Sequence, residues 1–233
     1  MEPFSFSLPT NLIMGKERYD EVGEQCAKLG KKVLLHYGGG SIKRNGVYDR
    51  VVASLKAAGL EVVELGGVKP NPRVELVREG VALCKKEGVD MILAVGGGSV
   101  IDSGKGIAVG ALSDIDIWDY YCGKVVADKA LPVGVVLTIP AAGSECSPVT
   151  VVTKMDTHDK RSFHNDLIIP RFAIVAPDAF TSLPKNQIAN ATIDVISHTL
   201  ERFFSDSTGV TLMDRFCVAT VENAMQQGLY LYD

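Results

Sequence analysis

Short runs of apolar residues alternate with longer segments of helical periodicity in the first part of this sequence, and this alternation constrains the fold more than any other feature. The apolar runs lie at 33–37, 60–65, 91–95 and 133–139. Three of them are nearly all apolar, as is typical of strands covered on both faces of a parallel sheet. We therefore predict an α/β domain whose parallel strands are connected by helices in right-handed crossovers.

Two of the connecting segments carry clear helix signals. Residues 45–58 place Val47, Val51 and Leu55 on one face, which is the pattern of an amphipathic helix. Residues 72–87 begin with a proline at a first-turn position, where its missing N–H costs nothing. These two segments therefore supply helices that can cover the predicted sheet.

The pattern changes near residues 177–184, which we interpret as a hinge. Beyond it, residues 185–204 and 210–227 have helical periodicity, and no strand candidate follows. Two such helices cannot form a core alone. We therefore expect an α/β domain at 1–184, followed at 185–233 by helices that must pack on the sheet domain or on a segment that is absent.

The composition excludes several classes of protein. The chain has 233 residues, 46% hydrophobic and 22% charged, which is typical of a globular protein and argues against disorder. A net charge of −4 without a basic stripe argues against a nucleic-acid or anionic membrane surface. The 5 scattered cysteines form no CxxC pair, so we expect reduced thiols and a cytoplasmic protein. We identify no signal peptide and no transmembrane run.

Two glycine turns, each ending in serine, lie between a buried strand and a predicted helix. They read Gly38-Gly39-Gly40-Ser41 and Gly96-Gly97-Gly98-Ser99. Glycines there let backbone N–H groups approach an anion, and the following helix N-terminus favours negative charge. Because parallel sheets bind ligands at the carboxyl ends of their strands, two such turns suit a dinucleotide. The alternative is that each run is merely a tight turn.

The residues around the first turn bear on which nucleotide binds. No carboxylate follows the strand at 33–37, and none stands at the end of the strand at 60–65 in the usual Rossmann sense. A carboxylate would repel a ribose 2′-phosphate, whereas Ser41 with Lys43 or Arg44 suits one. We therefore predict NADP(H) rather than NAD(H). The alternative is that both basic residues belong to a solvated helix start.

Asn71 lies between two prolines, in Lys69-Pro70-Asn71-Pro72. An asparagine there suits an Asx turn or the N-cap of the following helix. The other interpretation is a side-chain contact to the cofactor. The sequence by itself favours the cap.

Asp194 and His198 are four residues apart in the predicted helix at 185–204, so both side chains lie on one helix face. An oxygen and an imidazole nitrogen together suit Fe(II), Zn(II) or another divalent ion. The alternative is a surface contact between the two side chains. Of the other histidines, we expect His36 to be a satisfied core residue and His158 and His164 to lie in loops.

These segments together resemble the iron-containing (group III) alcohol dehydrogenase family, most closely its butanol dehydrogenase and NADPH-dependent aldehyde reductase branch. The match is ordered and covers essentially the whole chain. The segments that carry it are 37–43, 70–72, 96–102 and 137–145, together with Lys160 and the helix segment from Asp194 to His198.

The resemblance implies an α/β domain that binds NAD(P) and a helical, metal-binding domain of the dehydroquinate synthase-like fold. For the cofactor, it implies that the pyrophosphate is held by Gly97, Gly98 and Ser99, and that the adenosine ribose and its 2′-phosphate are surrounded by Gly38, Gly39 and Ser41. The nicotinamide half would be lined by Asp102, Thr138 and Lys160. For the metal, the resemblance implies that Asp194 and His198 are two of four ligands. A divalent metal, Fe(II) or Zn(II), would polarise an aldehyde oxygen while the nicotinamide transfers hydride. A homodimer is compatible with the family.

Two departures from the family pattern matter. The family supplies two further histidine ligands beyond position 233, so we expect this chain to be a fragment or a truncated gene product; the alternative is that another chain completes the site. Ala142 stands where relatives have a threonine that contacts the cofactor. The alternatives to a metal-dependent oxidoreductase are therefore a dinucleotide-binding fragment without turnover and a related fold with another reaction, as in glycerol-phosphate dehydrogenases or dehydroquinate synthases.

Overall fold

The computed structural model describes residues 7–206 and 209–232, in two compact units. The first unit contains the described residues up to Thr138 together with Gly143–Phe180, and the second contains Ile139–Ala142 and the described residues from Thr181 onward. The main division falls within the predicted hinge at 177–184. Residues 1–6, which bear on the expected absence of a signal peptide, lie outside the described part.

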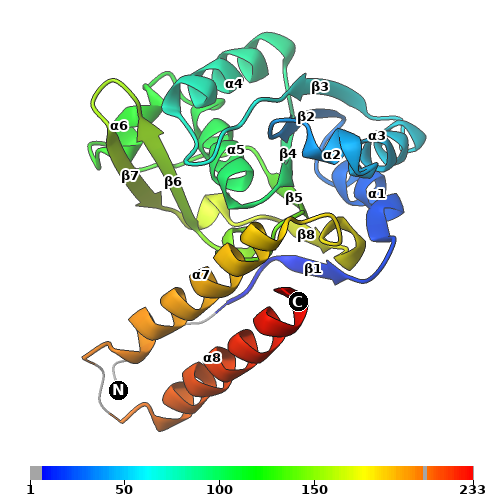
Figure 1. Ribbon diagram of the computed structural model, residues 1–233. Coiled ribbons are helices and arrows are strands. Elements are labelled where there is room, and N and C mark those ends of the chain that lie inside the picture. The colour runs from blue at the N-terminus through cyan, green and yellow to red at the C-terminus, as the bar shows by residue number, and fades with distance from the viewer. Residues whose placement is uncertain (1–6, 207–208, 233) are drawn as a thin grey trace. The chain divides into compact units, whose positions relative to one another are not determined.

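The first unit is built on a parallel sheet of six strands in the order β1-β8-β5-β4-β2-β3 (Figure 1). The predicted parallel α/β domain is confirmed, and all four predicted strands are present. The strands are β1 (Asn11–Met14), β2 (Lys32–Tyr37), β3 (Glu61–Leu65), β4 (Met91–Gly96), β5 (Val133–Leu137) and β8 (Phe172–Val175).

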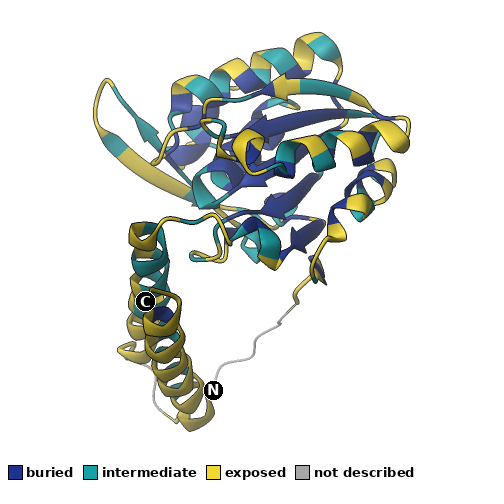
Figure 2. Ribbon diagram, turned by 45° about the vertical axis from the view of Figure 1, so that its right-hand side comes forward, coloured by how far each residue is buried: buried dark blue, intermediate teal, exposed yellow. Residues whose placement is uncertain are grey.

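Successive residues of each buried strand point to opposite faces of the sheet, and both sets of residues are apolar. Helices therefore cover both faces. Leu34 and Ile92 belong to one buried apolar cluster, and their neighbours Val33 and Leu93 belong to the other. Figure 2 shows the sheet buried between its helices. The helices are α1 (Glu21–Ala27), α2 (Ser41–Arg44), α3 (Val47–Ala57), α4 (Val74–Glu87), α5 (Gly98–Gly110) and α6 (Ile117–Tyr121), with 3-10 turns at Arg18–Asp20, Ser144–Cys146, Asp166–Ile168 and Pro177–Ala179.

An antiparallel hairpin, which the sequence did not predict, follows the sheet strand β5. It pairs β6 (Val149–Lys154) with β7 (Asp159–His164). The Thr153 backbone N–H donates to the carbonyl oxygen of Pro72 at 2.8 Å, which fixes the hairpin beside the start of α4. The expectation that His164 lies in a loop is wrong, because this residue ends β7, whereas His158 does lie in the turn.

The second unit consists mainly of two helices that pack side by side, α7 (Lys185–Phe203) and α8 (Thr211–Tyr232). Both were predicted, although α8 continues to Tyr232 rather than ending at residue 227. The helices approach closely where Gly228 lies against Thr192, since a Cβ on Gly228 would stand 2.4 Å from the Thr192 methyl carbon. No residue of α7 is buried and about half of its residues are exposed, whereas exposed residues cover most of α8 (Figure 2).

No helix in the described part of the chain is both long and apolar enough to cross a membrane. The described cysteines are all free thiols, of which Cys26 and Cys84 are buried. Burial raises the pKa of both thiols to about 12, so neither is a ready thiolate near neutral pH.

His36 is a satisfied core residue, as predicted. Its Nδ1 lies 2.9 Å from the Leu65 carbonyl oxygen and its Nε2 lies 2.9 Å from Ser103 Oγ. A neutral imidazole that donates from Nδ1 and accepts at Nε2 satisfies both contacts. Burial lowers the pKa of His36 from 6.5 to about 4.

This depressed pKa predicts acid destabilisation. As the pH falls from about 6.5 to 4, the unfolded state binds a proton at His36 before the folded state does, so stability falls. The loss at pH 4 should reach about 3 kcal/mol. Urea unfolding at pH 7 and pH 4 measures it, and His36→Gln should lose less stability than the unmodified chain over this interval. Equal losses in the two proteins would contradict the prediction.

Candidate functional site

The first glycine turn connects β2 to α2. Gly40 adopts a φ of 100°, in the left-handed region that favours glycine. A Cβ at Gly39 would meet no atom within 4 Å, so the backbone there faces open space. The carbonyl oxygen of Gly38 accepts from the Gly67 N–H at 3.1 Å, which ties the turn to the segment after β3. Ser41 is exposed at the start of α2.

The second glycine turn connects β4 to α5, whose first residue is Gly98. Gly97, Gly98 and Ser99 are all partly exposed. The Thr138 N–H donates to the carbonyl oxygen of Gly96 at 3.0 Å, which places Thr138 beside this turn at the end of the neighbouring strand β5. The first amides of a helix have no acceptor within the helix, so the start of α5 suits an anion.

Both glycine turns lie at the same edge of the sheet, because β2 and β4 are adjacent and parallel. An open backbone at Gly39 and a helix start at Gly98 are the features that a phosphate-rich, extended ligand requires. The residues of the first unit therefore fit a dinucleotide. The sequence placed both turns correctly at the carboxyl ends of buried strands.

Asp102 lies on α5, and both of its carboxylate oxygens are occupied. One accepts from Ser144 Oγ at 2.6 Å, and the other accepts from the Val151 N–H at 3.1 Å. Burial raises the pKa of Asp102, and the hydrogen bond from Ser144 opposes that rise. Asp102 therefore connects α5 to the loop and the strand that follow β5.

Lys105, one turn further along α5, is a functional candidate that sequence reasoning missed. It is fully buried, and its Nζ donates to the carbonyl oxygens of Ser144 at 2.7 Å, Ser147 at 2.7 Å and Val149 at 2.9 Å. Burial lowers the pKa of Lys105 to about 8. The sequence did contain a signal for this residue. Lys105 lies between two glycines in a segment that is apolar on all sides, where a charged side chain needs buried partners. Lys105 fixes the loop that Asp102 also contacts.

Asn71 and Lys160 are brought together although they are far apart in the sequence. The Lys160 Nζ, on β7, donates to Asn71 Oδ1 at 2.9 Å. The expectation that Asn71 caps the next helix is wrong, because Arg73 is the N-cap of α4. Asn71 has a φ of 55°, a left-handed conformation that asparagine tolerates. The Asn71 side chain therefore binds Lys160, which lies on the strand β7.

A charged and aromatic cluster lies beside the first glycine turn. Glu64, the penultimate residue of β3, accepts from the hydroxyls of Tyr37 and Tyr48, and Lys43 of α2 stands 3.9 Å from the same carboxylate. No acidic residue stands at the end of this strand in the usual Rossmann sense. Glu64 was missed because it lies within the strand and meets Tyr37, Lys43 and Tyr48 only through its side chain.

In the second unit, Asp194 and His198 face one another across one turn of α7. Asp194 Oδ1 lies 3.5 Å from His198 Nε2, and both side chains are about half exposed. Oxygen and imidazole donors on one helix face fit a divalent metal as two of its ligands. Among the described residues, however, no group of three or more His, Cys, Asp or Glu side chains converges. The pair alone is an incomplete ligand set.

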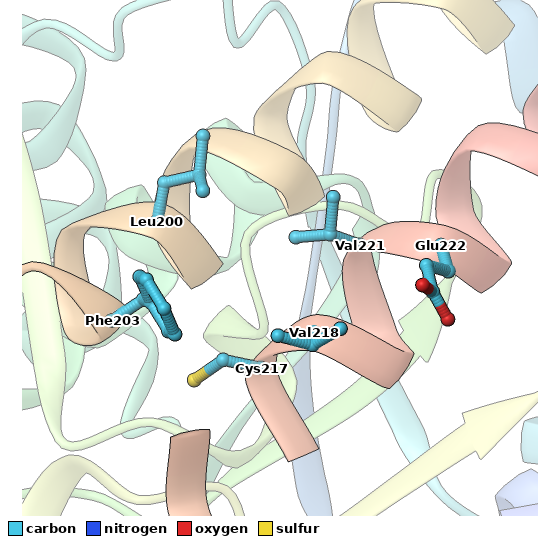
Figure 3. Close-up of a pocket in the computed structure, with 6 residues that line it drawn as sticks. All are labelled: Leu200, Phe203, Cys217, Val218, Val221 and Glu222. Atoms are coloured by element: carbon cyan, nitrogen blue, oxygen red, sulfur yellow. The ribbon is translucent and has the colours of Figure 1, made fainter. Parts of the chain in front are cut away.

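A small hollow between α7 and α8 is a separate feature of the second unit. Figure 3 shows Leu200 and Phe203 of α7 opposite Cys217, Val218 and Val221 of α8. The hollow encloses about 140 Å³ and its lining is almost entirely apolar. It therefore lacks the donors that a nucleotide phosphate requires.

The fold agrees with comparisons to known proteins. A family model described as iron-containing alcohol dehydrogenase matches residues 9–177, and the chain belongs to this family. The chain is 44% identical over 226 residues to a probable NADH-dependent butanol dehydrogenase 2 of Bacillus subtilis. This match covers 97% of the chain and 58% of the relative. It is 37% identical over 231 residues to the NADPH-dependent aldehyde reductase YqhD of Escherichia coli, covering 98% and 59%.

The solved structures support the same conclusion. The NADH-dependent butanol dehydrogenase A of Thermotoga maritima superimposes with a TM-score of 0.95 at 43% identity, over 99% of this chain and 58% of that chain. The predicted fold class and the resemblance to the family are thereby confirmed. The chain spans less than two thirds of the length of these relatives.

Proposed function

We propose that this chain contributes the cofactor domain of an oxidoreductase that interconverts primary alcohols and aldehydes by hydride transfer with NADP(H), with NAD(H) as the alternative cofactor. The observation that carries the proposal is the pair of glycine turns at the carboxyl ends of the adjacent strands β2 and β4. The relatives support it, because they are named as butanol dehydrogenases that depend on NADH and an aldehyde reductase that depends on NADPH. A small aldehyde or alcohol is the corresponding substrate.

The proposed roles follow the path of the dinucleotide along the sheet edge. The backbone of Gly97, Gly98 and Ser99 binds the pyrophosphate at the start of α5. Gly38, Gly39 and Ser41 surround the adenosine ribose. Asp102, Thr138 and Lys160 line the nicotinamide half, with Asn71 holding Lys160 in place. Asp102 and Lys105 also support the nicotinamide site indirectly, because both hydrogen-bond to Ser144 and so fix the loop that contains it.

We propose Asp194 and His198 as two ligands of a divalent metal, Fe(II) or Zn(II). When bound, the metal supplies Lewis-acid polarisation of a substrate oxygen. The remaining ligands would come from the part of the relatives that this chain does not span. A metal held by this pair alone would bind weakly, since water replaces the missing donors.

A second candidate function is dinucleotide binding without turnover. It is favoured by one observation, namely that the described residues bring only two metal donors of this kind together. A cytoplasmic location and a homodimer belong to the proposal in either case. The two candidates differ in whether added metal produces activity.

Binding and turnover assays on the purified chain separate these candidates. NADPH and NADH are titrated by nucleotide fluorescence, and NADPH oxidation by butanal is then followed with Fe(II) or Zn(II). We expect both nucleotides to bind, NADPH more tightly. Metal-stimulated oxidation supports the oxidoreductase, whereas binding without oxidation supports the second candidate. Failure of both nucleotides to bind contradicts the proposal.

A variant of the first turn tests where the ribose lies. Gly39→Asp introduces a carboxylate into open space, so the fold should tolerate it. The carboxylate should repel a 2′-phosphate and accept from a free 2′-hydroxyl. NADPH affinity should fall at least about tenfold while NADH affinity is kept or improved. Equal effects on the two nucleotides would place the ribose elsewhere.

A further inference from the structure

The cluster beside the first glycine turn consists of Tyr37, Lys43, Tyr48 and Glu64, and of these only Lys43 was a candidate to contact the cofactor. Glu64 Oε2 accepts from the Tyr37 hydroxyl at 3.0 Å, and Oε1 accepts from the Tyr48 hydroxyl at 2.6 Å. Each oxygen of this carboxylate thus has its own hydroxyl donor. The side chain is therefore held in one orientation although it is 41% exposed.

Lys43 is held by the same cluster. Its Nζ stands 3.9 Å from Glu64 Oε2, 4.9 Å from the centre of the Tyr37 ring and 4.4 Å from the centre of the Tyr48 ring. Both rings attract a cation. The ammonium group therefore rests between two aromatic faces and a carboxylate rather than extending freely into solvent.

The cluster lies next to the proposed ribose site for reasons of topology. Leu35 of β2 pairs with Glu64 of β3, so Glu64 is near the carboxyl end of the strand next to the first turn. Lys43 is two residues beyond Ser41 on α2. The Gly67 N–H donates to the Gly38 carbonyl oxygen, and this bond links the segment after β3 to the first glycine turn. The positive and negative charges of this cluster thus lie at the same end of the sheet as the open backbone of Gly39.

We propose that Glu64, oriented by Tyr37 and Tyr48, holds Lys43 and offsets its charge, and thereby weakens the preference of the site for a nucleotide with a ribose 2′-phosphate. Glu64 is a positioning residue for cofactor specificity that acts through Lys43. This inference rests on the proposed function, in which the first glycine turn surrounds the adenosine ribose.

The sign of the effect follows from the charges. Lys43 alone presents one positive charge to a phosphate, whereas Lys43 with Glu64 presents a pair without net charge. NADH has no 2′-phosphate, so its affinity should not depend on this pair. Because both side chains are about half exposed, the interaction is moderate and is reduced by salt.

The test compares nucleotide binding by the full chain and its Glu64→Gln variant, which keeps the size of the side chain and removes its charge. NADPH and NADH dissociation constants are measured by fluorescence titration at 20 mM and 500 mM NaCl. At low salt the preference for NADPH should rise about threefold to tenfold, entirely through NADPH, and the change should shrink at high salt. The matched control is Glu61→Gln, at the other end of β3, where the carboxylate pairs with Lys32 and no change is expected.

Lys43→Met identifies the residue through which Glu64 acts. It should lower NADPH affinity and leave NADH affinity unchanged, and Glu64→Gln added to it should have no further effect on the preference. A full Glu64→Gln effect in the absence of Lys43 would overturn the positioning role. Equal changes for both nucleotides, or an unchanged preference, would also overturn it while the proposed function stands. If the unmodified chain binds neither nucleotide, the proposed function fails and this inference fails with it.

Discussion

Replacing Lys105 with methionine should lower the free energy of unfolding by about 3–5 kcal/mol, because it leaves a buried polar network without its cation. Methionine matches the length of the lysine stem but donates nothing. The carbonyl oxygens of Ser144, Ser147 and Val149 each lose a donor, and Asp102 loses a nearby positive charge. Carbonyl oxygens that lose a donor and a carboxylate that loses a nearby cation are both costly in a buried site.

Urea unfolding at neutral pH measures this loss. The matched control is Lys28→Met, because Lys28 forms an exposed pair with Glu24 on α1, and its removal should change stability by less than about 0.5 kcal/mol. A loss below about 1 kcal/mol for Lys105→Met would mean that the loop at 144–149 keeps its place without the lysine. Nucleotide titration of the same variant would then show whether the nicotinamide half depends on it.

Gly23→Ala should be the second strongly destabilising substitution, by about 2–3 kcal/mol. An added Cβ would stand 2.2 Å from the Ser54 carbonyl oxygen and 2.9 Å from the Ala58 Cβ. The Ser54 oxygen belongs to the backbone of α3 and cannot rotate away, so α1 and α3 must separate. The Gly23 N–H also donates to Ser54 Oγ at 2.9 Å, and that hydrogen bond would be strained as well.

The loss of stability expected for Gly23→Ala is opposite in sign to the usual effect of replacing a helical glycine with alanine. In a helix without such a contact, alanine is more favourable than glycine by about 1 kcal/mol. Urea unfolding of Gly23→Ala beside Glu24→Ala, an exposed neighbour on the same helix, separates packing from propensity. A stability gain at Gly23 would show that α1 and α3 can move apart at little cost.

The sequence predicted the parts of the fold that follow from local pattern. The strands β2, β4 and β5 were recognised because they are apolar runs buried on both faces, whereas β3, which is only partly buried, was recognised as a short run rich in valine and leucine. The helix from Lys185 was placed within one residue of its observed end because its periodicity is long and regular. The strands β1 and β8 were missed, since each has four residues and they pair with one another from opposite ends of the domain.

The candidate site divides in the same way. The glycine turns and the Asp194–His198 pair were predicted from spacing alone, because the residues of each are neighbours in the chain. Lys105 and Glu64 were not predicted, because their partners are distant in sequence: Lys105 contacts Ser144, and Glu64 contacts Tyr37. The contact between Asn71 and Lys160 likewise depends on the hairpin, whose second strand, β7, is mostly polar.

The sequence by itself determined that the chain has a parallel sheet with a glycine turn after each of two buried strands, because burial and backbone freedom are encoded residue by residue. Only the tertiary structure decided which charges meet around those turns. A side-chain contact depends on the register between strands and on the packing of helices, so its geometry exists only once distant segments have been brought together.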